Sequence, residues 1–338
     1  MGGVNNISVL VNVRVVMTET INDEIICTTQ SSLDPEVKPL KNILITCDYS
    51  NQYFDSLIIC GDAKEELKKF HDNYFQCCIT SPPYWGLRDY GIPYQIGAEP
   101  KLDDYINNLV EVFREVRRTL SDDGTLWLNI GDSYTSGNRT WRDPDKKNPA
   151  RGMNYRPPTP SGLKSKDLIG VPWRLAFALQ SDGWFLRSDI IWHKPNCQPE
   201  SVKDRPTRSH EYLFLLTKSE KYLYNYDEIM EPSTDRKGMR NRRTVWSIKT
   251  EPFKYAHFAV FPKELIKPCI LGGSKRGDVV LDPFFGSGTV GIVGLKLNRR
   301  FVGIELNPEF IEIARRRFID EHLSISPAVK GYHCGGDI

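Results

Sequence analysis

A glycine-rich turn between an apolar strand and a helix restricts this chain to a small set of folds. Residues 278–282 are apolar enough for a buried strand, residues 287–297 are suited to a helix, and residues 301–305 predict a second strand. The turn itself, residues 286–291, has the G-x-G-x-x-G spacing that lets the backbone approach a ligand closely. Strand, turn, helix and strand in this order predict a parallel sheet with right-handed crossovers.

The same alternation of strands and helices occurs throughout the chain. Apolar side chains recur with helical spacing between residues 102 and 120, and the segment ends at a Ser-Asp-Asp-Gly turn signal. Similar patterns predict further helices at residues 63–70, 171–180, 262–271 and 308–319. Strands are predicted at residues 57–62, 75–80, 125–130, 184–193 and 212–217. We therefore expect an α/β fold with a doubly wound, mostly parallel sheet.

Composition excludes several classes of protein. With 40% hydrophobic and 26% charged residues, a chain of 338 residues can bury a large core. We find no apolar run of the ~20 residues that a membrane span needs and no basic leader before an apolar block, so we expect a cytoplasmic protein with no membrane contact. The eight cysteines show no metal-ligand spacing, which favours buried reduced thiols and no metal site.

A second motif follows the strand predicted at residues 75–80. Ser81-Pro82-Pro83-Tyr84 must leave the sheet, because proline cannot continue a central strand. The Ser81 hydroxyl and the Pro82 carbonyl can accept hydrogen bonds from the two hydrogens of an amino group, and Tyr84 offers a ring face on which a planar base can stack. These residue types predict chemistry on an exocyclic amine.

Carboxylates on both sides of the glycine turn point to the cofactor. Asp282 immediately precedes the turn, where it can accept from an α-ammonium group, and Glu305 is placed to accept from ribose hydroxyls. The glycines would let backbone N–H groups approach a carboxylate near a helix N-terminus. S-adenosylmethionine carries all three groups, whereas a nicotinamide cofactor lacks the ammonium.

The two motifs in this order resemble the amino-methyltransferases of DNA, specifically the permuted group called beta. The resemblance spans about residues 57–318 and includes residues 192–196, 210–212 and 256–262. It implies the Rossmann-like fold of S-adenosylmethionine-dependent methyltransferases, with a seven-stranded sheet in the order 3-2-1-4-5-7-6 and one antiparallel strand. It also implies that double-stranded DNA is the partner, with a cognate restriction endonuclease acting on the same site as a further candidate.

Site residues follow from the motifs and from the resemblance. The expected catalytic residues are Ser81, Pro82, Pro83 and Tyr84. The resemblance adds Asp62 as a contact to the adenine amino group and Phe258 as a cover for the cofactor, although such an aspartate is often a helix cap and Phe258 could belong to the core. The expected cofactor-binding residues are therefore Asp62, Phe258, Asp282, Phe284, Gly286, Gly288, Thr289 and Glu305.

Two irregular basic stretches, residues 136–166 and 234–249, interleave positive and aromatic side chains. Such stretches suit the phosphate backbone and base edges of DNA, although a charge run is more often a solvated face. The predicted DNA-binding residues are Arg88, Arg139, Arg142, Lys146, Lys147, Arg236, Arg240, Arg242 and Arg243.

The chain is interpreted as one catalytic domain, residues 42–338, with DNA-recognition inserts at residues 133–166 and 225–255. Residues 1–41 form an N-terminal extension of unclear role, and the alternation of apolar and polar residues at positions 7–15 could make an accessory strand.

The expected activity is methyl transfer to N4 of a flipped cytosine, because a serine before the two prolines accompanies cytosine more often than adenine in the resembled family. Adenine N6 is the alternative. A protein-glutamine methyltransferase, a nicotinamide dehydrogenase and a catalytically silent DNA-binding module are further alternatives. The first normally has asparagine before the prolines, and the second leaves residues 80–85 unexplained. The methyltransferase hypothesis requires Tyr84 and Gly286 to lie close together, and it leaves the recognition sequence and oligomeric state open.

Overall fold

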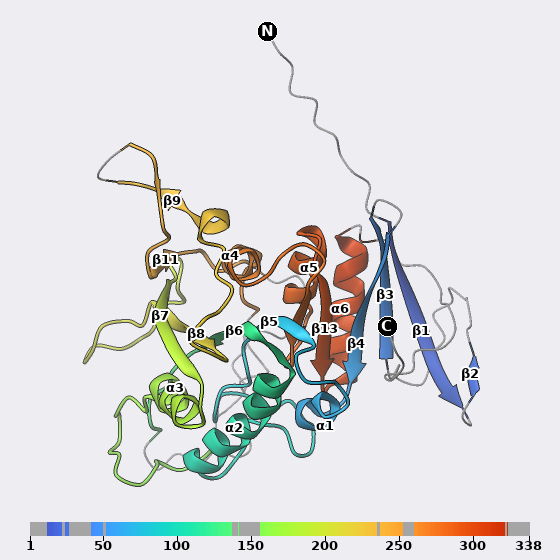
Figure 1. Ribbon diagram of the computed structural model, residues 1–338. Helices are drawn as coiled ribbons and strands as arrows, with labels where there is room; N and C mark the ends of the chain where they lie inside the picture. The colour runs from blue at the N-terminus through green and yellow to red at the C-terminus, as the bar shows by residue number, and fades with distance from the viewer. Residues whose placement is uncertain are drawn as a thin grey trace.

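The computed structural model describes the backbone of residues 12–21, 24–26, 42–49, 52–136, 141, 156–234, 237–252, 260–321 and 323, and side chains from residue 56 onward within these ranges. Most of the described chain is built around one large twisted sheet with helices on both of its faces (Figure 1). A separate two-stranded hairpin is formed by β9 (Glu231–Pro232) and β10 (Met239–Arg240).

The large sheet has eleven strands in the described part of the chain, in the order β11-β7-β8-β6-β5-β12-β13-β4-β3-β1-β2. The N-terminal strands are β1 (Asn12–Ile21), β2 (Glu24–Ile26), β3 (Asn42–Tyr49) and β4 (Gln52–Cys60). The others are β5 (Phe75–Thr80), β6 (Leu120–Ile130), β7 (Phe185–His193), β8 (His210–Thr217), β11 (Val245–Ser247), β12 (Val279–Asp282) and β13 (Arg300–Glu305).

Seven neighbouring strands of the sheet, in the spatial order β4-β13-β12-β5-β6-β8-β7, confirm the predicted core topology. This is the order 3-2-1-4-5-7-6 expected from the resemblance, with β12, the strand before the glycine turn, as strand 1. The strand β8 runs antiparallel to both of its neighbours, β6 and β7. Four further strands extend this core: β3, β1 and β2 beyond β4, and β11 in parallel beyond β7. Edge strands present unpaired backbone groups, which added strands can pair. The N-terminal extension therefore contributes β1 and β2 to the sheet.

Helices cover the two faces as separate layers (Figure 1). One layer consists of α1 (Ala63–Leu67), α2 (Leu102–Thr119) and α3 (Val171–Ser181). The other consists of α4 (Lys263–Gly273), α5 (Thr289–Lys296) and α6 (Pro308–Asp320), with a short 3-10 helix, η2 (Tyr226–Ile229), packed against α4.

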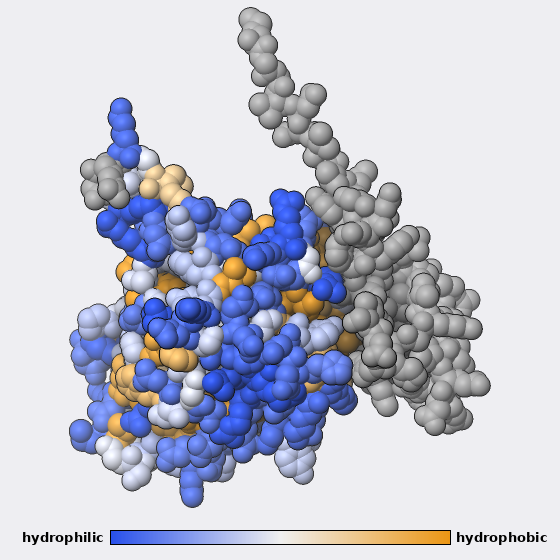
Figure 2. Space-filling view, viewed as in Figure 1, coloured by the Kyte–Doolittle hydropathy of each residue, from blue (hydrophilic) through white to orange (hydrophobic). Residues whose placement is uncertain are grey.

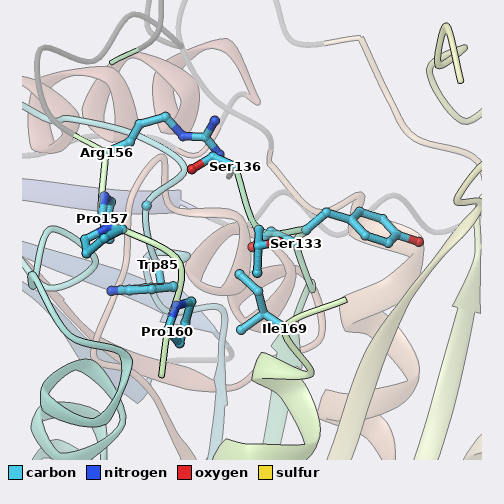
Figure 3. Close-up of a pocket in the computed structure, with 11 residues that line it drawn as sticks. Trp85, Ser133, Ser136, Arg156, Pro157, Pro160 and Ile169 are labelled. Atoms are coloured by element: carbon cyan, nitrogen blue, oxygen red, sulfur yellow. The ribbon is translucent and has the colours of Figure 1, made fainter. Parts of the chain in front are cut away.

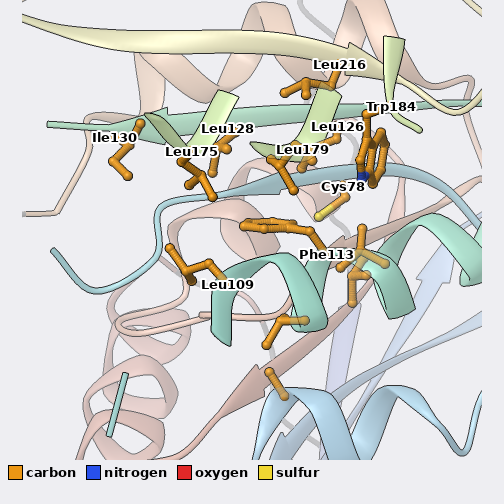
Figure 4. Packing of buried hydrophobic residues seen from close by; sticks show 14 of the residues in the cluster. Cys78, Leu109, Phe113, Leu126, Leu128, Ile130, Leu175, Leu179, Trp184 and Leu216 are labelled. Carbon is orange, nitrogen blue, oxygen red and sulfur yellow. The ribbon is translucent and has the colours of Figure 1, made fainter. Parts of the chain in front are cut away.

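Side chains of β6 show why both faces of the sheet are apolar. Leu126 and Leu128 pack toward α2 and α3, where Phe113 of α2 points toward the sheet (Figure 4). Trp127, between these two leucines, belongs to the opposite apolar cluster with residues of α4. Because alternate residues of a strand point to opposite faces, a strand covered on both sides must be apolar throughout.

The helix α2 illustrates how local sequence determines an element. Its buried positions recur at helical spacing, and acidic residues in the first turn and basic residues in the last turn complement the helix dipole. The observed bounds agree with the prediction for residues 102–120 within one residue. This helix carries Tyr105, which the next subsection places against the catalytic loop.

Most of the coloured surface in view is hydrophilic, and apolar colour appears in separate patches, one of them over α3, whose Phe177 is 53% exposed (Figure 2). The five cysteines with described side chains are free thiols: Cys77, Cys78 and Cys269 are buried as predicted, whereas Cys60 and Cys197 are only partly buried. Within the described ranges, no helix is both long enough and apolar enough to cross a membrane.

Candidate active site

The two predicted motifs meet at the carboxyl ends of neighbouring strands. β5, which ends at Thr80, pairs in parallel with β12, which ends at Asp282. The Thr80 hydroxyl donates a hydrogen bond of 2.7 Å to Asp282 Oδ1, across 202 positions of sequence. The two loops therefore begin side by side, as the methyltransferase hypothesis requires, and this edge of the sheet is the usual ligand crevice of open α/β folds.

Residues around the Ser-Pro-Pro-Tyr loop hold it in one conformation. The Tyr105 hydroxyl of α2 donates to the Pro83 carbonyl at 2.8 Å, and the Trp85 indole N–H donates to the Glu99 carbonyl at 2.9 Å. Immediately downstream, the Gly86 N–H donates to the carbonyl of Gly97 at 2.8 Å. These bonds, together with the fixed φ of two prolines, orient the Ser81 hydroxyl and the Pro82 carbonyl in advance.

Tyr84 is tied to the antiparallel hairpin of β7 and β8. Its hydroxyl donates to Glu211 Oε2 at 2.9 Å, and the Ser81 hydroxyl donates to the Tyr84 oxygen at 3.5 Å. Burial, followed by the nearby negative charge of Glu211, raises the pKa of Tyr84 well above its ordinary value. The phenol therefore stays protonated and can act as a hydrogen-bond donor throughout the neutral pH range.

The glycine turn adopts backbone conformations that favour glycine. Gly286 has φ +52° and Gly288 has φ +81°. The Gly286 N–H donates to Glu305 Oε2 at 2.7 Å, and the Gly288 N–H donates to the Phe285 carbonyl at 2.9 Å. The N–H groups of Gly286 and Gly288 thus already have protein acceptors, although the sequence predicted that backbone N–H groups at this turn would approach a cofactor carboxylate. A Cβ added at Gly286 would come no closer than 3.9 Å to its neighbours, so this position is open to a ligand.

Two buried carboxylates flank the turn. Asp282 Oδ1 accepts from Thr80 and from the Phe284 N–H, while Glu305 accepts from the N–H groups of Gly286 and Asn307. Burial raises the pKa of both Asp282 and Glu305 to about 7. Neither has a lysine or arginine at ion-pair distance among the described residues. A pair of acceptors of this kind fits a ligand that brings an ammonium group and hydroxyl groups as hydrogen-bond donors.

The remaining predicted cofactor residues have visible structural roles. Phe284 packs edge-on against Phe113 with ring centres 6.4 Å apart, and Thr289 begins α5 and accepts from the Arg317 guanidinium at 3.0 Å. Asp62 is the N-cap of α1 and accepts from the Glu65 N–H at 3.1 Å, which is the helix-cap alternative noted above. Asp62 nevertheless lies near Glu305, because the backbone N–H of the preceding residue, Gly61, donates a hydrogen bond to the Glu305 carbonyl. Phe258 lies outside the described residues.

The predicted DNA-binding residues fall into three groups. The Arg88 side chain hydrogen-bonds to Tyr90, whose ring packs edge-on against Phe310 of α6, so Arg88 is directed toward the cofactor side. Arg240 pairs with Glu231 in the β9–β10 hairpin, Arg242 lies over the Trp246 ring and Arg243 is exposed. The others lie outside the described residues: Arg139, Arg142, Lys146, Lys147 and Arg236.

An open surface hollow, with about 270 Å³ of empty space that includes open solvent, borders the catalytic loop and the first basic insert (Figure 3). Trp85 lies beside Pro157 and Pro160 in it, and Arg156 reaches toward Ser136. Its hydroxyl and guanidinium donors suit a sugar-phosphate backbone. The lining residues are Trp85, Gly86, Ser133, Tyr134, Thr135, Ser136, Arg156, Pro157, Pro158, Pro160 and Ile169.

Sequence reasoning missed four residues that position this site: Thr80, Tyr105, Lys194 and Glu211. The last two lie in stretches that carried the family resemblance, but no role was assigned to them. For Thr80 and Tyr105, no sequence signal was available, because their partners are distant in the chain.

Comparisons with known proteins agree with this geometry. A sequence model described as DNA methylase (N6 and N4 methyltransferases) matches residues 75–316. The Type II methyltransferase M.SmaI of Serratia marcescens is 65% identical over 263 residues, covering 78% of this chain and 90% of that protein. The Type II methyltransferase M.Cfr9I of Citrobacter freundii is 63% identical over 265 residues, covering 78% of this chain and 88% of that protein. The solved structure of PvuII DNA methyltransferase (cytosine-N4-specific) has a similar fold, with a TM-score of 0.59 and 19% sequence identity. The match covers 77% of this chain and 85% of that one.

Proposed function

Because the chain belongs to the DNA methylase family of N6 and N4 methyltransferases, we propose that it methylates the exocyclic N4 of a cytosine in double-stranded DNA. The broader activity follows from the family: the protein is a Type II DNA methyltransferase, and S-adenosylmethionine is its methyl donor. Membership of this family sets aside the dehydrogenase and protein-glutamine alternatives.

The observation that most supports this function is the hydrogen bond between Thr80 and Asp282. Thr80 immediately precedes the amine-binding loop, and Asp282 immediately precedes the cofactor turn. This one hydrogen bond therefore places the loop that would hold the target amine next to the turn that would hold the methyl donor. Positioning two reactants in this way can supply much of the rate acceleration.

The catalytic loop can make the target amine nucleophilic without a covalent intermediate. The Ser81 oxygen and the Pro82 carbonyl accept from the two amino hydrogens, which favours a pyramidal nitrogen whose lone pair is no longer delocalised into the ring. The Tyr84 ring stacks on the base. Flipping the nucleotide out of the duplex costs about a few kcal/mol, which stacking partly offsets.

The cofactor residues bind and orient the donor. S-adenosylmethionine supplies an electrophilic methyl group on a sulfonium when it is bound. Asp282 accepts from its ammonium group, Glu305 accepts from ribose hydroxyls, and Phe284 provides an apolar wall at the turn, with open space at Gly286. Gly288 and Thr289 shape the start of α5, and Asp62 and Phe258 are proposed contacts at the adenine.

The choice of cytosine rests on Ser81. In this family, a serine before the two prolines accompanies cytosine N4 more often than adenine N6, and an aspartate accompanies adenine. Adenine N6 is therefore the alternative target, and the experiment below distinguishes the two.

Residues 42–338 are proposed as the catalytic domain, with DNA recognition in the inserts at residues 133–166 and 225–255. The surface hollow at Arg156 adjoins both the first insert and the catalytic loop, which supports a DNA path along this side. Arg240, Arg242, Arg243 and Arg88, with the predicted residues outside the described ranges, would contribute phosphate contacts. A restriction endonuclease of the same specificity is a proposed partner.

The deciding experiment incubates the protein with methyl-labelled cofactor and mixed-sequence duplex DNA, then digests the DNA to nucleosides for chromatography. We expect label on N4-methyl-deoxycytidine. Label on N6-methyl-deoxyadenosine would replace cytosine with adenine as the target. DNA binding without any label would support the catalytically silent module instead.

Cofactor affinity should depend on pH between 6 and 8. The pKa of Asp282 is raised to about 7, and its carboxylate must be ionised to accept from an ammonium group. Below pH 7 binding must therefore release a proton, so we expect Kd to rise about tenfold from pH 8 to pH 6 for this group. Calorimetric titration at pH 6, 7 and 8 measures it.

The variant Asp282→Asn serves as the comparison for this prediction. It should bind more weakly at pH 8 and lose part of the pH dependence, because its amide does not titrate. A wild-type Kd that is constant from pH 6 to pH 8 would contradict the assigned role of Asp282.

A further inference from the structure

We propose that Glu211 is a positioning residue that sets the direction of a hydrogen-bond chain through Tyr84 to Ser81, and thereby keeps the Ser81 oxygen available as an acceptor for the target amine. This inference rests on the proposed function, since the amine belongs to its substrate. It assigns a role to the stretches around Lys194 and Glu211, which the catalytic and cofactor motifs left unexplained.

The chain joins three elements. Tyr84 lies in the loop after β5, and its hydroxyl oxygen is 2.9 Å from Oε2 of Glu211 on β8. Ser81 Oγ lies 3.5 Å from the same hydroxyl oxygen. Lys194, directly after β7, forms an ion pair with the other carboxylate oxygen of Glu211. The side chains of Glu211 and Lys194 are each 18% exposed. Tyr84, Glu211 and Lys194 therefore continue a polar path that starts at Ser81, at the edge of the site.

The direction of the chain follows from counting donors and acceptors. An ionised carboxylate can only accept, so Tyr84 must donate its single proton to Glu211. The Tyr84 oxygen is then free to accept the single proton of Ser81. With its own proton directed toward Tyr84, Ser81 presents only lone pairs to a bound base. If Tyr84 donated to Ser81 instead, the serine proton would oppose an amino hydrogen.

The surroundings keep Glu211 in place. The Lys194 ammonium also lies 4.1 Å from the centre of the Trp192 ring, which adds a cation–π contact. Gly131, at the end of β6, allows the close approach: a Cβ there would lie 2.7 Å from Tyr84 Cε2 and 3.3 Å from Glu211 Cδ. A neutral serine can in this way serve as a directed acceptor, because the charge that orients it lies two side chains away.

The variant Glu211→Gln tests the direction with little change in size. Lys194 is a pure donor, so it should take the amide oxygen and leave the amide NH₂ facing Tyr84. Tyr84 must then accept from the amide and donate to Ser81, which reverses the chain. We expect the single-turnover methylation rate to fall about 10- to 100-fold, less than for loss of a group that contacts the reacting centre directly. Kd for cofactor and DNA should stay within about twofold of wild type.

Two further variants separate this role from general damage. Asp189→Asn, an exposed carboxylate on β7 of the same hairpin, should keep the wild-type rate. Tyr84→Phe breaks the chain at its middle, so the double variant Tyr84→Phe with Glu211→Gln should be no slower than the slower single variant. A wild-type rate for Glu211→Gln, or fully multiplying losses in the double variant, would overturn the proposal.

Failure of the proposed function gives a different result. If the wild-type protein methylates no DNA, the proposed function is wrong. The hydrogen-bond chain can still be tested, because a double-mutant cycle of Tyr84→Phe and Glu211→Gln in urea unfolding measures the coupling between the two side chains. Coupled unfolding free energies support the contact, whereas additive ones overturn it.

Discussion

Replacement of Ser81 by alanine should reduce the single-turnover rate of methyl transfer by about 10²- to 10³-fold, the range for loss of one preorganised hydrogen-bonding group at the reacting centre. Alanine removes one of the two proposed acceptors of the target amine and leaves the Pro82 carbonyl alone. The stacking surface of Tyr84 and the cofactor carboxylates stay in place. The rate should therefore fall while Kd for cofactor and DNA remains close to wild type.

Rapid-quench measurements at saturating DNA and cofactor isolate this step. Ser188→Ala on β7 is a suitable control, because it makes the same chemical change in a strand away from the loop. If Ser81→Ala methylates at the wild-type rate, the serine is not an acceptor for the amine. An equal loss of DNA affinity would instead assign Ser81 to substrate binding.

Replacement of Gly303 by alanine should give a large loss of stability, about 1–3 kcal/mol, as is typical of overpacking in a well-packed core. A Cβ at Gly303 of β13 would lie 2.3 Å from Phe285 Cδ2. The Phe285 ring cannot move aside easily, because it packs against both Phe301 and Phe318, with ring centres 5.3 Å and 6.5 Å away, and these two rings also pack against each other. Since Phe285 directly precedes the glycine turn, cofactor affinity should fall as well.

Urea unfolding and cofactor titration of the same preparation measure both effects. Gly294→Ala in α5 is the matched control, since its Cβ would meet no atom closer than 4.0 Å. Alanine there should be neutral or stabilising by about 0.5–1 kcal/mol, because glycine weakens a helix interior. An unchanged midpoint for Gly303→Ala would show that the ring stack relaxes without cost.

Local periodicity predicted most elements of this fold. The bounds of α2, β5 and β13 agree with their predictions within one residue, because the apolar spacing that defines them is read from consecutive residues. β6 differs: a turn was predicted before residue 125, but the strand begins at Leu120, where it pairs with Phe75 before a register shift. That extension depends on a neighbouring strand, which local patterns do not contain.

The candidate site divides in the same way. Motif chemistry identified Asp282 and Glu305, and the structure places both at the glycine turn. It did not identify Glu211, which reaches Tyr84 across 127 positions, nor Tyr105, which holds the Pro83 carbonyl from another layer. Backbone N–H groups of the glycine turn were predicted to approach a cofactor carboxylate, but the Gly286 N–H donates to Glu305, because that buried carboxylate requires a partner.

The amino-acid sequence by itself determined the α/β class, the order of the motifs and the chemical character of the two loops, because residue type and short-range spacing carry that information. Only the tertiary structure decided which groups touch: the contact of Thr80 with Asp282, and the path from Ser81 through Tyr84 to Glu211. Hydrogen bonds act over about 3 Å, so the pairing of strands β5 with β12 and β6 with β8 had to bring distant residues together before these contacts existed.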